Sequence, residues 1–258
     1  MGNKEHIQIQ KQEQIRTIYE ELVRFSDDEK RVVLPRFFKT GKGEYGEGDK
    51  FIGVIVPNVR SVAKAHKDCS LDTVAKLLDS EWHECRLCAL LILREKFRKS
   101  PDSIVNFYLT HTKGINNWDL VDLSAPYILG EYLLIKQGNP KQHNIKQNTI
   151  DQEGRKILYE LAESEIMWER RIAVVSTLML IRHNQFEDII RLAEKLMDSK
   201  HDLMQKAIGW MLREIGKRDE TILKAFLEKH CTKMPRTMLR YAIEKFPPHI
   251  RQDYMQRE

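Results

Sequence analysis

Residues 81–93, EWHECRLCALLIL, decide the fold class, because their apolar positions recur with the period of an α-helix. From Cys85 to Ile92 one stripe of such a helix is apolar, as in a helix that packs on a core. Two later stretches, MWERRIAVVSTLML at 167–180 and HDLMQKAIGWMLRE at 201–214, begin with polar or charged residues and continue with an alanine and an apolar run. The sequence therefore predicts a chain of repeated helices.

The same periodicity predicts helices over most of the chain. They are expected at residues 9–26, 28–39, 57–67, 71–80, 83–98, 102–112, 117–137, 149–164, 167–183, 186–199, 202–217, 219–230 and 235–246. Helical pairs then recur about every 35 to 45 residues, which is the spacing of HEAT or armadillo repeats. We expect an all-α fold in which HEAT-like repeats form a curved solenoid, as one domain over residues 1–258 with an extended concave surface.

Prolines and glycines mark the helix ends. Pro57, Pro101 and Pro235 stand where a first helical turn is expected to begin. Gly138-Asn139-Pro140 ends the helix predicted at 117–137, and the polar stretch 141–148 reads as a longer loop.

Composition and charge limit the classes of function. Hydrophobic residues make up 41% of the chain and charged residues 31%, with a net charge of +5, which is compatible with a nucleic-acid partner but does not require one. No run of about 18 apolar residues is present, so we expect no membrane contact. The N-terminus lacks the apolar core of a secretory signal. The four dispersed cysteines suit reduced thiols, so we expect a cytoplasmic protein.

Residues 41–46, GKGEYG, match the G-x-G-x-x-G pattern of dinucleotide sites. That pattern needs a strand before it and a helix after it. Here a helical pattern, KRVVLPRFFK, precedes it, and the short apolar run FIGVIVP follows. We therefore interpret the segment as a flexible loop with a basic flank.

A second pattern, His66-x-x-Cys69 followed by Cys85-x-x-Cys88, resembles zinc-ligand spacing. The segment between the two pairs is mostly an amphipathic helix, and the later pair lies on its own helix's apolar stripe. Buried structural thiols are the favoured interpretation, with a zinc site as the alternative, and no metal or cofactor is expected.

The helix predicted at 202–217 has an apolar face and, opposite it, a tryptophan among cations. Lys206, Trp210, Arg213 and Lys217 share that second side. Such a surface suits the phosphates and sugars of a nucleic acid. The alternative is a tryptophan packed on a neighbouring helix and covered by the stems of the cations.

Arg171 lies in the helix predicted at 167–183, which is apolar nearly all round. A buried guanidinium needs an anion, because an unpaired buried charge is costly. The anion is either a carboxylate of this chain or a bound phosphate.

The stretch NNWDLVDLSAPYILG, beginning at Asn116, places Trp118 and Asp122 four residues apart on one helical face. Asn117 suits an N-cap, and Asp119 suits the positive end of the helix dipole. Asp122 lies beyond the first turn in an apolar context and therefore needs a partner or a function. The alternative to a functional role is a structural ion pair between Asp122 and Arg171.

Three stretches together resemble the AlkC/AlkD family of DNA alkylation-repair glycosylases, most closely its AlkD branch. They are WDLVD at 118–122, WERR at 168–171 and QKAIGWMLRE at 205–214, the last being the most specific. The likeness extends in order from about Arg36 to the C-terminus. The resemblance implies a HEAT-like solenoid that holds duplex DNA, and monofunctional removal of N3- and N7-alkylated purines without metal or cofactor. It also implies action without burial of the flipped base in a pocket.

The resemblance also suggests roles for residues. It makes Asp122 the catalytic carboxylate, Trp118 and Trp210 aromatic walls, and Arg171 an active-site arginine. Lys206, Arg213, Lys217, Phe37 and Arg240 are expected to contact DNA, and the protein is expected to be a monomer, at the nucleoid when bound. The rival is a non-catalytic helical-repeat binder of DNA, RNA or protein.

The chain departs from the family pattern near its N-terminus. The Gly-rich loop at 41–48 is not expected in this branch, and the aromatic DNA-contacting position is Phe37 or Phe38. A polar contact expected just before Pro57 is replaced by apolar residues. These differences concern the choice of lesion more than the reaction.

Overall fold

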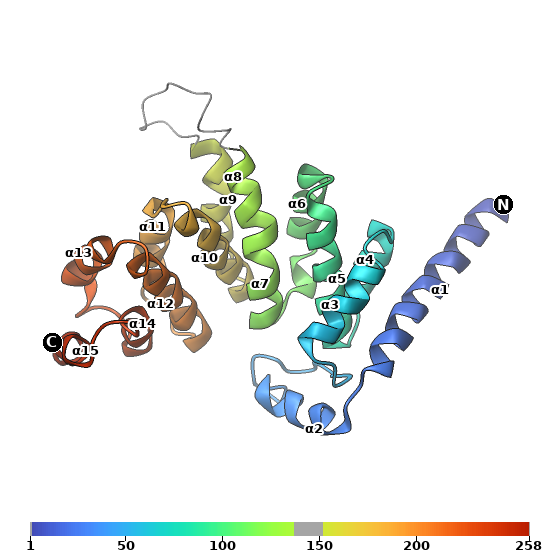
Figure 1. Ribbon diagram of the computed structural model, residues 1–258, viewed down its shortest axis with the longest axis horizontal. Coiled ribbons are helices and arrows are strands. Elements are labelled where there is room, and N and C mark those ends of the chain that lie inside the picture. Colours follow the sequence, from blue (N-terminus) through green and yellow to red (C-terminus); the bar gives the residue numbers. More distant parts are fainter. Residues whose placement is uncertain (1, 137–151, 258) are drawn as a thin grey trace. The chain divides into compact units, whose positions relative to one another are not determined.

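The computed structural model describes residues 2–136 and 152–257. Within those ranges the regular elements are helices, and the only strand-type pairing is an isolated bridge between Lys50 and Trp82 (Figure 1). The all-helical prediction is confirmed. None of these helices is both long enough and apolar enough to cross a bilayer.

The chain divides into two compact units, residues 1–124 and 125–258. The boundary falls at the C-terminal end of one helix, and each unit has its own buried apolar core. The expectations of a single domain and of a HEAT-like solenoid stay predictions.

Unit 1 is built around one almost fully buried helix. Its helices are α1 (Gly2–Arg24), α2 (Asp28–Phe37), α3 (Val56–Ala65), α4 (Leu71–Leu78), α5 (His83–Phe97), α6 (Pro101–Thr110), the 3-10 turn η1 (Thr112–Gly114) and α7 (Trp118–Ala125). Residues 83–93 form most of α5, and α3, α4 and α6 pack on it. Helix α1 lies across α3 and α4 through the buried side chains of Ile18 and Leu22.

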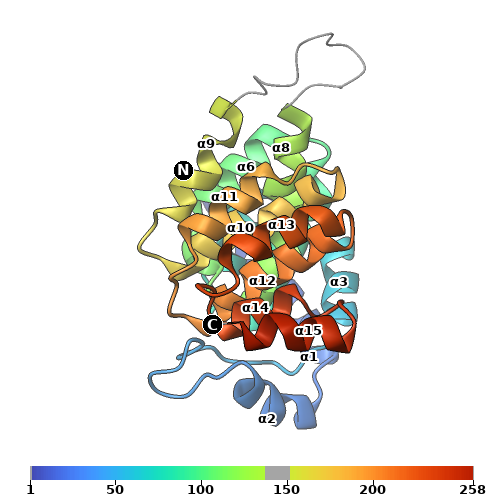
Figure 2. The same ribbon diagram turned by 90° about the vertical axis from the view of Figure 1, so that its left-hand side faces the viewer.

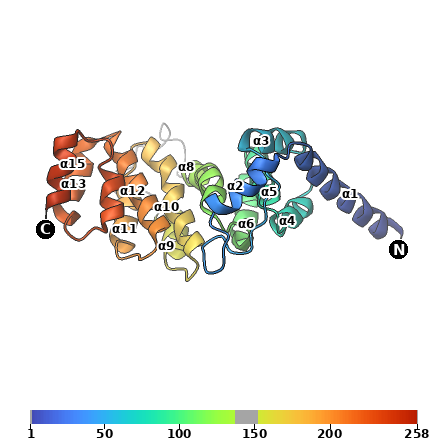
Figure 3. The ribbon, with the colours of Figure 1, turned by 90° about the horizontal axis from the view of Figure 1, so that it is seen from below.

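Helix α2 buries none of its residues, unlike α3, α4, α5 and α6. Seen from below, it lies in front of the ends of its neighbours (Figure 3). Asp27 caps it, accepting from the N–H of Lys30, and the Asp27 N–H donates to the Gly53 carbonyl at 3.1 Å. Gly53 has φ of +92°, and a Cβ there would lie 2.5 Å from the Asp27 carbonyl oxygen. Only glycine permits this close approach without a shift of the backbone.

Unit 2 consists of the π-turn η2 (Pro126–Gly130) and helices α8 (Glu131–Lys136), α9 (Gln152–Ala162), α10 (Met167–Arg182), α11 (Glu187–Lys195), α12 (Asp202–Gly216), α13 (Glu220–His230), α14 (Arg236–Ala242) and α15 (Pro248–Gln256). Helix α10 is central, as its all-round apolar sequence predicts, and packs on η2, α9 and α12. Helix α14 packs closely on α12, with α15 beside it (Figure 2).

The structure differs from the sequence expectation in three elements. The helix predicted at 117–137 is interrupted by η2, because Pro126 has no N–H to offer the carbonyl four residues before it. Helix α15 was not expected; Pro248 stands in its first turn, where the missing N–H costs nothing. Helix α1 begins at Gly2, seven residues earlier than expected from position 9. The predicted ending at Gly138–Pro140 and the polar stretch after it lie outside the described residues.

Candidate functional site in unit 1

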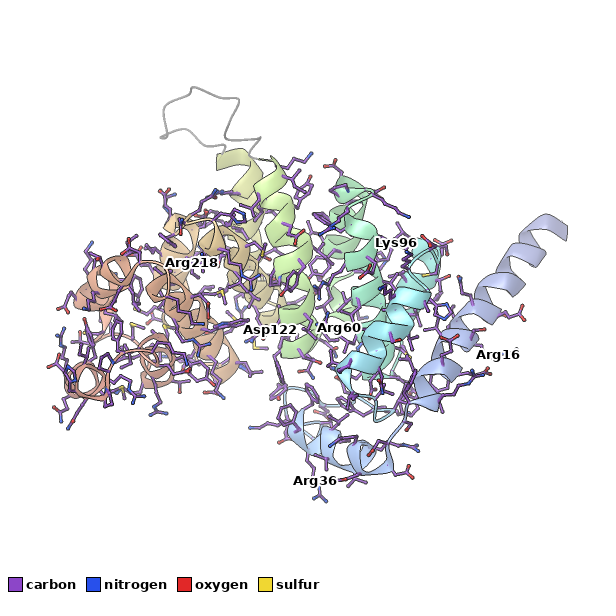
Figure 4. All side chains as sticks on the ribbon, viewed as in Figure 1. Arg16, Arg36, Arg60, Lys96, Asp122 and Arg218 are labelled. Carbon is purple, nitrogen blue, oxygen red and sulfur yellow. The ribbon has the colours of Figure 1, made fainter. Side chains whose placement is uncertain are left out.

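A cavity of about 510 Å³ lies within unit 1, and Trp118 and Asp122 are both on its wall. Phe37 and other apolar side chains of α2 form a further side. Three of the residues singled out in the sequence are therefore brought together. Figure 4 marks Asp122 on α7, and Arg36 on α2. The Asp122 side chain is partly exposed and takes part in a polar interaction within the structure.

Helix α7 is held at almost every residue around Trp118 and Asp122. The Asn117 side-chain oxygen accepts from the N–H of Trp118, the first residue of α7, at 2.8 Å. Arg94 of α5 donates to the Leu123 carbonyl at 3.0 Å, and the Tyr108 hydroxyl of α6 lies 2.9 Å from the Ser124 hydroxyl. Such contacts limit the freedom of the two side chains that face the cavity.

Asp119 does more than complement the positive end of the helix dipole, which is the role that the sequence suggests. Its carboxylate is buried and lies 2.8 Å from Nε2 of His83, while Nδ1 of His83 lies 3.2 Å from Asp49. Burial opposes a charged imidazole, but the two carboxylates outweigh burial and raise the pKa of His83 to about 9. The imidazolium therefore ties α5 to α7 and to the loop before α3.

Asp49 is the second anion of this cluster. Its carboxylate lies 2.7 Å from Nη2 of Arg86, and the side chain of Asn117 donates to it. Burial favours the neutral acid, yet the hydrogen bond from His83 and the charge of Arg86 hold the pKa of Asp49 below its usual value. Two buried cations are thus matched by two buried carboxylates, as buried charges require.

Glu84 organises the segment that leads into α3. Its two carboxylate oxygens accept from the backbone N–H groups of Ile52, Gly53 and Val54, at 2.9, 2.8 and 3.1 Å. These amides belong to no strand, so the buried carboxylate supplies the partners they would otherwise lack.

Aromatic rings continue from this cluster to the cavity. The imidazole of His83 stacks on Phe51 with ring centroids 4.6 Å apart, and Phe38 stacks on Phe51 at 5.0 Å. Phe38 also stacks on Trp118 at 5.3 Å with an interplanar angle of 21°, and Phe37 meets Trp118 edge-on at 5.9 Å. Phe38 is buried, whereas 59% of Phe37 is exposed, so Phe37 is the one of these two phenylalanines that is available to a ligand.

The Gly-rich loop does not offer its amides to a phosphate. The N–H of Gly41 donates to Glu44 and that of Gly43 to Glu47, each at 2.8 Å, and the N–H of Gly46 donates to the Lys39 carbonyl. A helix precedes the loop and no strand does. The rejection of a dinucleotide fingerprint is supported, because the nucleotide site would need those amides free.

The cysteines are buried free thiols. Burial raises the pKa of Cys85 to about 12 and that of Cys88 further. In the ranges that the structure describes, no cluster of three His, Cys, Asp or Glu side chains is arranged to hold a metal ion. Cys85 and Cys88 are therefore core residues with little thiolate character.

Candidate DNA-contacting residues of unit 2

The polar side of α12 carries Trp210 and its cations, as predicted, but carboxylates accompany them. Glu214 accepts from the indole N–H of Trp210 at 3.2 Å and lies 2.6 Å from Nζ of Lys217. Lys206 lies 2.6 Å from Asp202, and Arg213 pairs with Glu244. Arg240 is exposed on α14. The pairs of the two lysines are partly exposed, so exchanging them for phosphate contacts costs little.

Arg171 is only 4% exposed, and its guanidinium donates to the Leu203 carbonyl at the start of α12 at 2.5 Å. Burial, together with the charges of Arg170 and Arg171, holds the pKa of His201 below its usual value. The carbonyl contact links α10 to α12. Whether Arg171 also serves a phosphate stays a prediction.

Residues missed and comparisons with known proteins

The sequence did not single out four buried charged residues of unit 1: His83, Asp49, Arg86 and Glu84. One signal was present: three of these ionisable residues stand at the start of α5, a helix whose apolar stripe predicts that it packs on a core. Charges in such a position need buried partners. The partner of two of them, Asp49, lies more than thirty residues away, and its position had no such signal.

The family model described as "DNA alkylation repair enzyme" matches residues 18–246. Among solved structures, the chain is similar to a predicted DNA alkylation repair enzyme from Enterococcus faecalis, with a TM-score of 0.64 and 15% identity over 86% of this chain and 97% of that one. At that identity the likeness shows the fold alone. A search of curated proteins finds no match.

Proposed function

Because the chain belongs to the DNA alkylation repair enzyme family, we propose that it is a monofunctional DNA glycosylase that excises N3- and N7-alkylated purines from duplex DNA in base excision repair. The observation that carries the proposal is the position of Asp122, a carboxylate on the wall of a mostly apolar cavity beside Trp118. A carboxylate held there can stabilise positive charge on a reacting sugar.

The reaction is hydrolysis of the bond between C1′ of deoxyribose and N9 of the purine. The bond's electron pair leaves with the base, whose positive charge is thereby neutralised, and oxocarbenium charge develops on the sugar. Water then adds its oxygen to C1′ and loses a proton. Since an alkylated purine is already cationic, it leaves without a general acid, a metal or an organic cofactor.

Asp122 acts in two ways in this scheme. Its negative charge stabilises the oxocarbenium ion as it forms, and one carboxylate oxygen aligns the attacking water and accepts its proton. The indole face of Trp118 adds a cation–π attraction of about 0.5 to 2 kcal/mol to the cationic sugar or base. Its stacking on Phe38 fixes the plane of that indole.

Unit 2 supplies contacts to the duplex in this proposal. The indole of Trp210 packs on the DNA backbone, while Lys206, Arg213 and Lys217 pair with phosphates in exchange for their present carboxylates. Arg171 holds a phosphate in addition to its carbonyl contact. Exposed Arg240 adds a further positive charge on the helix that packs on α12.

We further propose that the helical pairs are HEAT-like repeats stacked as a solenoid, and that the protein is a cytoplasmic monomer that associates with the nucleoid. The three alanines that align in α5, α10 and α12 support the repeat assignment. Light scattering after size-exclusion chromatography measures the oligomeric state, and X-ray scattering in solution distinguishes an elongated solenoid from a compact bundle.

The proposal is tested by the release of 7-methylguanine and 3-methyladenine from methylated duplex DNA. We expect release by the wild type, with the DNA strand left intact at an abasic site. Asp122→Asn should lose at least about a hundredfold in single-turnover rate, since removing one preorganised charged group typically costs that much. Asp68→Asn is the matched control, because Asp68 is an exposed carboxylate of unit 1 outside the cavity lining.

A non-catalytic binder would give a different result. If neither the wild type nor Asp122→Asn releases a base while both bind DNA equally, the glycosylase proposal is wrong and a binding module remains. Circular dichroism and thermal unfolding of the variants separate loss of chemistry from loss of fold.

A further inference from the structure

His83 is a buried histidine whose two ring nitrogens both face carboxylates. Nε2 lies 2.8 Å from Asp119 and Nδ1 lies 3.2 Å from Asp49, and the residue is 2% exposed. An ionised carboxylate only accepts hydrogen bonds, so both contacts are satisfied only when both ring nitrogens carry a proton. A neutral imidazole has one N–H and would turn the lone pair of its other nitrogen toward a carboxylate. The hydrogen-bond pattern therefore requires an imidazolium.

The charged groups around the imidazole favour the same form. Burial and the charge of Arg86 on α5 favour the neutral imidazole, but Asp119 on α7 and Asp49 in the loop before α3 outweigh them and raise the pKa of His83 to about 9. The other charged residues of the cavity wall are Lys30 on α2, Glu84 on α5 and Asp122 on α7. His83 therefore keeps its second proton at neutral pH and loses it in the alkaline range.

The two carboxylates connect the imidazole to the backbone on either side of Trp118. Asp119 follows Trp118 directly in the first turn of α7. On the other side, Asn117 donates to Asp49 and accepts from the Trp118 N–H at 2.8 Å. A shift of either carboxylate contact therefore displaces the start of α7.

A column of stacked rings connects the same imidazole to the indole. His83 stacks on Phe51 with ring centroids 4.6 Å apart, and Phe51 stacks on Phe38 at 5.0 Å. Phe38 in turn stacks on Trp118 at 5.3 Å and also lies 4.9 Å from the imidazole. Because closely packed rings leave no space for one of them to move alone, a displaced imidazole displaces the indole.

We propose that His83 is a positioning residue for Trp118, and that only its doubly protonated form holds the indole in place. Loss of the second proton breaks one of the two carboxylate contacts, so that the start of α7 or the loop before α3 shifts and Trp118 moves with it. The consequence for base excision rests on the proposed function, but the position of the indole does not. On that function, the protonation of a buried histidine sets the alkaline limit of base excision.

The position of the indole is measured without DNA. The full chain is labelled with 5-fluorotryptophan, and the fluorine NMR resonance of Trp118 is identified by its loss in Trp118→Phe. We expect this resonance to shift as pH rises from 7.5 to 10, with its midpoint near the pKa of His83, about 9. A resonance that stays constant through this range would overturn the proposal.

Asp119→Asn distinguishes positioning from a merely structural role. The asparagine oxygen can still accept from the Leu120 N–H, as Oδ1 of Asp119 does at 2.9 Å, while the amide donates to Nε2 of a neutral imidazole. The neutral form of His83 then satisfies both partners, and the charge that raises its pKa most is gone. We expect the transition of the Trp118 resonance to move to lower pH by about one pH unit or more. An unchanged midpoint would contradict the proposal.

Two control variants test whether the transition belongs to His83. His66→Gln removes a histidine of unit 1 that pairs with Glu21 at 3.0 Å and does not line the cavity. Lys30→Gln removes the other cationic side chain of the cavity wall. We expect both to keep the wild-type transition and His83→Gln to abolish it, with circular dichroism showing that each variant is folded. Loss of the transition in either control would assign it to another group and overturn the proposal.

The effect on base excision is measured as single-turnover release of 3-methyladenine at saturating protein, after subtraction of the release without protein. We expect the ratio of the wild-type rate to the His83→Gln rate to fall at least tenfold between pH 7.5 and 10. Because both proteins act on the same DNA, ionisation of the substrate cancels in this ratio. His66→Gln should show the wild-type dependence on pH.

The outcomes separate the positioning role from the proposed function. A transition of the Trp118 resonance without base release at any pH would keep the proton-dependent position of the indole and reject the glycosylase. Base release with a rate ratio that does not change with pH would keep the glycosylase and overturn the role of His83 in it.

Discussion

At the scale of single residues, His83 is the clearest case of a side chain whose role depends on its partners. Its raised pKa means that the folded protein binds a proton that the unfolded chain releases at neutral and alkaline pH. The stabilisation is therefore fully present below the ordinary histidine pKa of 6.5 and is lost as pH rises through about 9. This is the opposite direction from a paired carboxylate.

We therefore expect the free energy of unfolding of the wild type to fall, relative to that of His83→Gln, between pH 6.5 and about 9. The difference should be on the order of 1 to 3 kcal/mol, since one pKa unit corresponds to about 1.4 kcal/mol. Urea unfolding of both proteins at the two ends of this range measures it. Parallel curves for the two proteins would show that His83 is neutral in the fold.

Glu84 provides a second test at this scale. Both of its oxygens accept from backbone amides, so Glu84→Gln must present an N–H to an N–H donor. We expect a loss of about 2 to 4 kcal/mol in the free energy of unfolding, as for a buried charged acceptor that is removed. Glu81→Gln, whose carboxylate is exposed and pairs with Lys50, should change it by less than about 1 kcal/mol. Equal effects of Glu84→Gln and Glu81→Gln would mean that the hydrogen bonds between Glu84 and the amides of residues 52–54 add no stability.

At the scale of elements, the position of α2 depends on one glycine. Gly53→Ala introduces a side chain at positive φ and 2.5 Å from the Asp27 carbonyl oxygen, so the backbone contact that holds the start of α2 must open. We expect a cost of about 2 to 4 kcal/mol in thermal unfolding, from strain plus the lost contact. Gly43→Ala has positive φ but no neighbour within 4 Å, so it should cost only about 1 kcal/mol. The difference between the two variants measures the close approach itself.

At the scale of the whole molecule, the net charge of +5 allows DNA binding but does not locate it. On the proposed function, DNA affinity should fall steeply as salt rises, because phosphate contacts release counterions. Arg240→Ala should lower the slope of log affinity against log salt by about 1. Lys195→Ala, on α11 outside the proposed contacts and paired with Glu163, should leave the slope unchanged. An equal change of the slope by Arg240→Ala and Lys195→Ala would indicate that the slope reports the net charge of the protein and not a phosphate contact of Arg240.

The helical elements were predictable from the sequence because helical periodicity is a local property. In α5, α10 and α12, charged residues, a small residue and an apolar stripe occur together within about a dozen positions. Prolines mark the first turns of several helices. The position of Trp118 and Asp122 on one helical face was predictable for the same reason, since residues four apart lie about one helical turn apart. The predictions were wrong at two prolines. Pro126 begins a π-turn within the helix that was predicted to run without interruption over 117–137. Pro247-Pro248 begins a helix that periodicity did not indicate.

The tertiary structure alone decided which side chains surround His83, Glu84 and the cavity. His83 meets Asp49 and Asp119 across separations of 34 and 36 residues, and Glu84 reaches back about as far to the amides before α3. Helical periodicity does not specify which charged residues pair when they lie far apart in the sequence. Their pairing depends on how the helices pack and exclude water. The cavity under α2 also results from tertiary packing. Each residue of its wall, taken alone, is of a type common in cores or on surfaces. These residues form a cavity only because α2 packs without burying any of its own residues.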